Sequence, residues 1–142
     1  MTPSSTQSIA FTGQIPITFD TVAYDNTGQM ANITSHTITT IRPGRYAISA
    51  SAYFDSLTDQ EYSLETDIQQ NGTANGLTFR TVLPIATGSL PTNASLVING
   101  VSVCSGGDVI TMSITQQNTG SAAITLFQGP FTYLTVTEIP QW

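Results

Sequence analysis

Residues 40–54 constrain the fold of this 142-residue chain more than any other stretch. A turn, Arg42-Pro43-Gly44, leads into a run in which apolar side chains occupy every second position. Successive side chains of a strand point to opposite faces of a sheet, so the run predicts a strand with one buried face. The predicted core face consists of Tyr46, Ile48, Ala50, Ala52 and Phe54.

The opposite face of this predicted strand carries small side chains, among them Ala47, Ser49 and Ser51. A sheet face that is open to water normally carries larger polar and charged residues. We therefore expect another strand layer or a second subunit, and not bulk water, to cover this face.

The rest of the chain repeats the alternating pattern in short segments. Hydrophobic residues make up 39% of the sequence and charged residues only 8%, and no helical period extends beyond a few residues. Eight or more short strands at regular spacing predict an all-β sandwich or closed barrel. We expect turns at Asn71-Gly72 and Asn75-Gly76. The pair Asn99-Gly100 fits either a hairpin turn or a bulge within one long strand.

The length predicts a single domain over residues 9–142, preceded by a polar, flexible arm at residues 1–8. Net charge is −6, and the only fixed cations are three arginines, which argues against binding to nucleic acids or anionic membranes. No apolar run approaches the length of a membrane span. Residues 1–8 also lack the basic and apolar regions of a secretory signal peptide.

The sequence offers little material for catalysis. His36 is the only histidine, and we expect it at the surface or the rim of a sheet. Cys104 is the only cysteine, which excludes an internal disulfide and predicts a buried, inert thiol. The chain has no phosphate-binding loop and no nucleophile elbow. We expect no enzymatic activity, no catalytic residue and no cofactor.

Acidic residues are concentrated in one region. Five of the nine lie between positions 55 and 67, namely Asp55, Asp59, Glu61, Glu65 and Asp67. Ca²⁺ prefers several oxygen ligands from a flexible loop, but this spacing matches no defined calcium loop. We expect a solvated acidic loop, with a Ca²⁺ site as the alternative.

Four motifs occur in the same order as in the complement C1q / tumour necrosis factor family, which the chain resembles over about residues 9–139. They are Phe19-Asp20-x-x-x-Tyr24-Asp25, Ile38-Thr39-Thr40-Ile41-Arg42-Pro43-Gly44-Arg45-Tyr46, Gly107-Asp108-Val109 and Phe131-x-x-Leu134. The resemblance implies a jelly-roll sandwich of about ten strands that assembles as a homotrimer. Aromatic side chains are typical interface anchors, so the candidates for the trimer interface are Tyr53, Phe131 and Tyr133.

Two roles fit such a trimer best. In the first it is a structural component of a virion surface that decorates or cements a phage capsid by binding the major capsid protein. The predicted contacts are Thr2, Pro3 and Ser4 of the arm and Asp55 and Asp59 of the acidic loop. The alternative is a receptor- or glycan-binding head of a fibre or of a cell-surface protein. A secreted signalling ligand ranks third, because residues 1–8 show no export signal.

Overall fold

The computed structural model describes residues 1–11, 13–23, 25, 28, 30–55, 57, 62–83, 93–118 and 123–140. Within these residues the chain forms strands and one short 3₁₀-helix, as the predicted all-β class requires. No helix in this part of the chain has the length and apolar character needed to cross a membrane. The elements are β1 (Gln7–Ile9), β2 (Gln14–Pro16), β3 (Ala31–Asn32), β4 (Thr37–Thr39), β5 (Gly44–Asp55), β6 (Tyr62–Gln70), β7 (Thr73–Leu83), β8 (Asn93–Cys104), β9 (Val109–Asn118), β10 (Ile124–Leu126), η1 (Gly129–Phe131) and β11 (Tyr133–Ile139).

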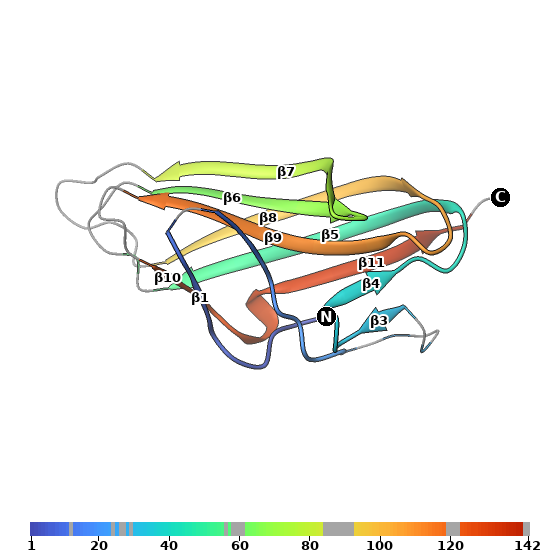
Figure 1. The fold of residues 1–142 in the computed structure, drawn as a ribbon, viewed down its shortest axis with the longest axis horizontal. Helices are drawn as coiled ribbons and strands as arrows, with labels where there is room; N and C mark the ends of the chain where they lie inside the picture. The colour runs from blue at the N-terminus through green and yellow to red at the C-terminus, as the bar shows by residue number, and fades with distance from the viewer. Residues whose placement is uncertain are drawn as a thin grey trace.

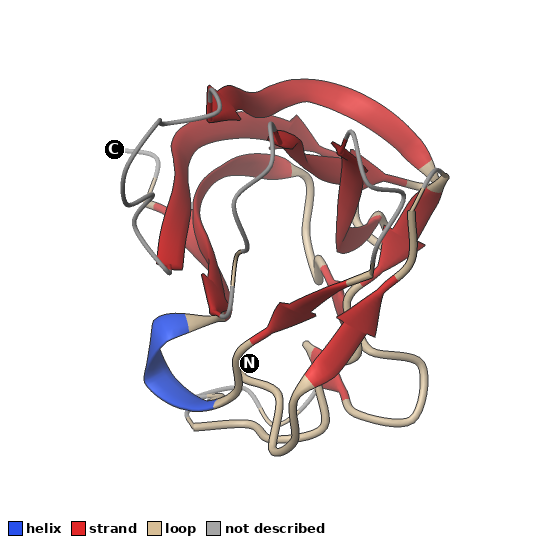
Figure 2. Ribbon diagram, turned by 90° about the vertical axis from the view of Figure 1, so that its left-hand side faces the viewer, coloured by secondary structure: helices blue, strands red, loops and turns tan. Residues whose placement is uncertain are grey.

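The strands form two antiparallel sheets that enclose a common core (Figure 1, Figure 2). The first sheet contains β1, β10, β5 and β11, and β8 pairs with the other edge of β5. The second sheet has the order β3-β4-β9-β6-β7, and β2 also pairs with β9. The chain changes sheet between β1 and β2, β4 and β5, β5 and β6, β7 and β8, β8 and β9, and β9 and β10. This arrangement confirms the predicted β-sandwich and gives it a jelly-roll architecture.

Strand β5 lies between β8 and β11 and supplies the centre of the first sheet. Its predicted core face is buried, with all five side chains between 0% and 2% exposed. These residues pack against inward side chains of the second sheet, including Leu64, Ile68 and Met112. The alternation in the sequence therefore predicted the buried face of this strand correctly.

The three Asn-Gly pairs take three different conformations. Asn71-Gly72 forms the β6–β7 turn with φ of 54° and 76°, as predicted. Asn75-Gly76 lies inside β7, so the turn predicted there is wrong. Asp67 and Gln69 of β6 pair with Thr78 and Ala74 of β7, so three β7 residues lie opposite the single β6 residue Ile68. Asn75 and Gly76 are two of these three residues, which form a bulge-like irregularity in β7. Asn99-Gly100 continues β8 in unbroken register with β5, so it forms neither a hairpin turn nor a bulge.

The predicted N-terminal arm lies against the domain instead of extending from it. Thr2 forms a β-bridge with Thr21, and Pro3 is buried. Ser4 donates hydrogen bonds from its N and Oγ atoms to the two carboxylate oxygens of Asp20, at 2.6 and 2.5 Å. These contacts satisfy backbone donors and acceptors that a free arm would leave to water. The predicted role of Thr2, Pro3 and Ser4 in binding a partner stays a prediction.

Candidate assembly surface

The outward face of the first sheet carries apolar side chains. On β8, Val97, Val101 and Val103 are 44%, 48% and 74% exposed. Directly paired residues of antiparallel strands share a face, so Val97 lies beside Ser51 of β5 and Val101 lies beside Ala47. We call the outward side chains of β8, β5 and β11, together with Phe131, the assembly face.

Aromatic side chains occupy one end of the assembly face. The ring of Tyr53 lies 5.4 Å from that of Phe131 and 5.9 Å from that of Phe127, measured between ring centroids. Phe131, in η1, is 57% exposed. Tyr133 begins β11 and is paired with Ser51. The fold thus brings all three predicted interface candidates to the same face, and their role between subunits stays a prediction.

A row of polar side chains crosses the middle of the assembly face. Ser49 of β5 is paired with Asn99 of β8 on one side and with Thr135 of β11 on the other. The Ser49 hydroxyl donates to Asn99 Oδ1 at 2.7 Å and lies 3.4 Å from the Tyr133 hydroxyl. The face therefore combines exposed valines with a hydrogen-bonded row of polar side chains.

The small second face of β5 was predicted to be covered by a strand layer or by another subunit. Ser51 is only 4% exposed, and Ala47 and Ser49 are half-buried. No strand in the described residues is stacked on this face, so adjacent side chains of the same sheet are what shields these three residues from water. The strand-layer alternative is therefore wrong for this part of the chain, and the subunit alternative remains.

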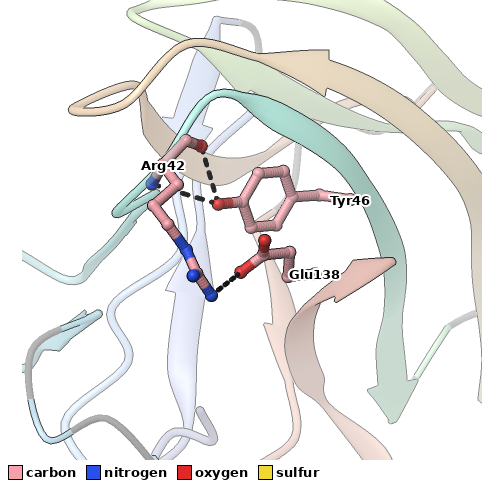
Figure 3. A network of polar contacts seen from close by, with 3 residues as sticks. All are labelled: Arg42, Tyr46 and Glu138. Atoms are coloured by element: carbon pink, nitrogen blue, oxygen red, sulfur yellow. Dashed lines mark hydrogen bonds and ion pairs between the residues drawn. The ribbon is translucent and has the colours of Figure 1, made fainter. Parts of the chain in front are cut away.

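The Arg42-Pro43-Gly44 turn is fixed to the sheet by Tyr46 and Glu138 (Figure 3). Tyr46 is 1% exposed, and its hydroxyl reaches the rim of the core and donates to the Arg42 carbonyl oxygen at 2.9 Å. The Arg42 guanidinium pairs with the Glu138 carboxylate of β11 at 2.9 Å. Because these side chains are well exposed, the ion pair itself adds little stability.

The turn before β9 packs against the segment that precedes β5, so two of the motifs quoted for the family resemblance meet in space. Thr40 N donates to the Asp108 carbonyl oxygen at 2.9 Å, and Gly107 N donates to the Thr40 carbonyl oxygen at 2.7 Å. A Cβ atom at Gly106 would lie 2.9 Å from the Ile41 carbonyl oxygen, which explains the glycine. Both turns lie at the same end of the sandwich (Figure 1).

The Asp108 side chain joins this turn to the β6–β7 turn. Its carboxylate accepts hydrogen bonds from Asn71 Nδ2 at 2.8 Å, from Ser105 N at 2.6 Å and from Gln70 Nε2 at 2.6 Å. Through these three bonds Asp108 fixes the loop that precedes Val109. Donors of this kind favour the charged carboxylate, and the bonds from Asn71, Ser105 and Gln70 lower the pKa of Asp108.

The Asp108 contacts predict a specific loss of stability in acid. The folded-state pKa of Asp108 is below the ordinary value of 3.8, so the stabilisation is complete above that value and is lost as the pH falls through the folded-state pKa. We expect Asp108→Asn, which does not titrate, to unfold at a lower urea concentration at pH 7 and to lose less stability than the wild type below pH 4. Urea unfolding at fixed pH values measures both.

Asp20 supplies the control for this experiment. Hydrogen bonds from Ser4 lower the pKa of Asp20 as well, so Asp20→Asn should remove a separate share of the acid dependence. The effects of the two substitutions on the loss of stability in acid should add, because the two carboxylates accept hydrogen bonds from different donors. An Asp108→Asn variant with the same stability–pH curve as the wild type would contradict the proposed role of Asp108.

Of the predicted acidic loop, Asp59 and Glu61 lie outside the described residues, as does the side chain of Asp55. The solvated loop therefore stays a prediction, with the Ca²⁺ site as its alternative. No three His, Cys, Asp or Glu side chains in the described part of the chain lie close enough to hold a metal ion. On the outward face of the second sheet, Glu65 borders a shallow depression of about 130 Å³. Its lining is polar and consists of Ser63, Glu65, Thr115 and Gln117.

The only histidine and the only cysteine lie apart from the assembly face. His36 is half-buried with φ of 58°, and its Nδ1 atom lies 2.8 Å from the Phe19 carbonyl oxygen. Cys104 ends β8 with 3% exposure, which confirms the predicted burial. Burial raises the pKa of the Cys104 thiol, so the reactive thiolate is disfavoured.

The strand pairing defines a jelly-roll β-sandwich, and the outward face of its first sheet carries exposed valines and few charges. Among solved structures, the chain is similar to one described as the globular domain of zebrafish complement 1qA protein. The two share 16% sequence identity over 92% of this chain and 96% of that chain, with a TM-score of 0.48. No family model and no curated protein matches the sequence. The fold assignment rests on the strand pairing described above.

Proposed function

We propose that this chain is a non-enzymatic structural protein that assembles as a homotrimer through the assembly face. The exposure of Val97, Val101 and Val103 on one sheet face carries the proposal. Several exposed apolar side chains gathered on one sheet face are typical of interaction sites on folded proteins.

Size and charge support a second copy of the chain as the partner. Strand β5 has 12 residues, so three neighbouring strands span roughly 40 by 14 Å. The flat area of this face is about 560 Å². Protruding side chains increase its accessible surface toward the roughly 800 Å² that each partner buries in a standard interface. No outward residue of β8 or β11 is charged, and among the described side chains of β5 the only charged one is that of Arg45, near the start of the strand. Chains with a net charge of −6 can therefore meet here without apposing acidic side chains.

The trimer is tested by placing a charge at the centre of the assembly face. We expect the wild type to have three times the 15.1 kDa mass of the chain and Val101→Arg to be monomeric, because an unpaired guanidinium would be buried at each interface. Light scattering after size-exclusion chromatography measures the mass. Gln117→Arg adds the same charge to the outward face of the other sheet and should remain trimeric. A monomeric wild type would overturn the proposal.

The particle that this trimer joins is, in our proposal, a virion, with the major capsid protein of a phage as partner. The low charge content and the absence of lysine support a place on the virion surface. They leave few sites for proteases that cleave after basic residues, which suits a protein exposed on the outside of a particle. Purified protein should bind capsids that lack it and raise their resistance to heat. Failure both to bind and to stabilise such capsids would exclude the decoration role and leave the trimer intact.

The polar depression beside Glu65 favours a second candidate, a receptor- or glycan-binding head. Its hydroxyl, carboxylate and amide groups are the kinds that hydrogen-bond sugar hydroxyls, and it lies on the sheet that the trimer would leave free. Saturable binding of oligosaccharides by the wild type and its loss in Thr115→Val would favour this role. Binding that Thr115→Val leaves unchanged would exclude the depression as the site.

A further inference from the structure

Asn99 stands out because its position is unfavourable for its residue type. Asn is depleted in strands, and here it occupies the middle of the 12-residue strand β8. Its outward neighbours along the strand are Val97 and Val101, which are 44% and 48% exposed. The following residue, Gly100, forms no turn that would explain the Asn-Gly pair. A side chain that opposes both local propensity and its apolar surroundings calls for a functional explanation.

The contacts of Asn99 fix the orientation of its amide. The Oδ1 atom accepts the hydrogen bond from Ser49 Oγ at 2.7 Å, and Ser49 in turn lies 3.4 Å from the Tyr133 hydroxyl on the far strand. The amide group Nδ2 makes no hydrogen bond among the described residues, and the Asn99 side chain is exposed. With Oδ1 held by Ser49, the Nδ2 donors point away from that bond.

We infer that Asn99 determines the specificity of self-association, by donating from Nδ2 to an acceptor on a neighbouring copy. The inference rests on the proposed trimer. Burying the face around an unpaired amide would leave its donors unsatisfied, so only arrangements that supply an acceptor are favourable. The apolar residues provide contact area in many registers, whereas the amide selects one. A single polar residue in an apolar interface fixes register and oligomeric state in the same way in coiled coils.

The test compares Asn99→Val with a matched control in the same row. Thr135→Val makes a similar polar-to-apolar change on β11, also beside Ser49 and also exposed. We expect native mass spectrometry to give a single trimer for the wild type and for Thr135→Val. Asn99→Val should give a mixture in which at least a third of the protein is in other oligomers, because the selective contact is gone while the apolar area has increased.

The outcomes separate this inference from the proposed trimer. A monomeric wild type would overturn both. A trimeric wild type with an Asn99→Val variant that is equally uniform, or with a Thr135→Val variant that is equally mixed, would overturn the role of Asn99 alone. If Asn99→Val fails to fold by circular dichroism, Asn99→Ser serves instead. Its hydroxyl oxygen can still accept a hydrogen bond from Ser49, but the shorter side chain lacks the Nδ2 donors. It should therefore give the same mixture, and a uniform trimer would overturn the inference.

Discussion

Replacing Phe54 with alanine is expected to lower the free energy of unfolding by about 3–5 kcal/mol, the usual cost of removing a large aromatic side chain from a core. Phe54 is 0% exposed and lies at the end of the core face of β5. It is paired with Leu126 of β10 and with Ala94 of β8, so the substitution leaves a cavity where three strands meet. Domains of this size unfold with only about 5–15 kcal/mol, which makes this one of the largest effects available from one residue.

Urea unfolding at constant pH and protein concentration measures the loss. The concentration must be held fixed, because self-association would contribute to the apparent stability. Ile33→Ala is the control: it also removes an apolar side chain, but Ile33 is 48% exposed in the β3–β4 turn, so the change should stay within about 0.5 kcal/mol. Equal losses in the two variants would contradict the assignment of Phe54 to the core.

The sequence predicted the core of β5 because alternation is a local signal. Each apolar residue from Tyr46 to Phe54 follows its predecessor by two positions, and that spacing alone determines which side chains share a face. The turn at Asn71-Gly72 was predictable for the same reason, since both residues accept positive φ. The irregularity at Asn75-Gly76 was not, because it depends on the register between β6 and β7.

The assembly face was only partly predictable. The sequence indicated that the second face of β5 needed cover, and it selected Tyr53, Phe131 and Tyr133 as interface candidates. It did not identify Val97, Val101 and Val103 as outward, because the strand around Asn99-Gly100 had two possible conformations. Pairing of β8 with β5 in one register resolves this and places the valines beside the small residues of β5. Such an assignment requires the partner strand, which no local pattern specifies.

Replacing Gly100 with alanine is expected to cost about 1–3 kcal/mol, because the Leu77 side chain must move to make room for the added methyl group. A Cβ atom there would lie 2.4 Å from Leu77 Cδ2, 3.1 Å from Cδ1 and 3.3 Å from Cγ. All three atoms belong to one side chain, which reaches from β7 in the second sheet into the position that a side chain at 100 would occupy. Gly100 is therefore explained by packing between the two sheets and not by a turn.

A double-mutant cycle separates this explanation from a general cost of changing β8. In the Leu77→Ala background the space is vacated, so Gly100→Ala should stabilise the protein by about 0.5–1 kcal/mol, the usual advantage of alanine over glycine within a strand. The sign of the effect thus reverses between the two backgrounds, and urea unfolding of the four proteins gives the coupling energy. Gly106→Ala is the matched control, since its clash is with the backbone oxygen of Ile41, which Leu77→Ala does not move. A Gly100→Ala cost that is the same in both backgrounds would show that Leu77 is not what excludes a side chain from position 100.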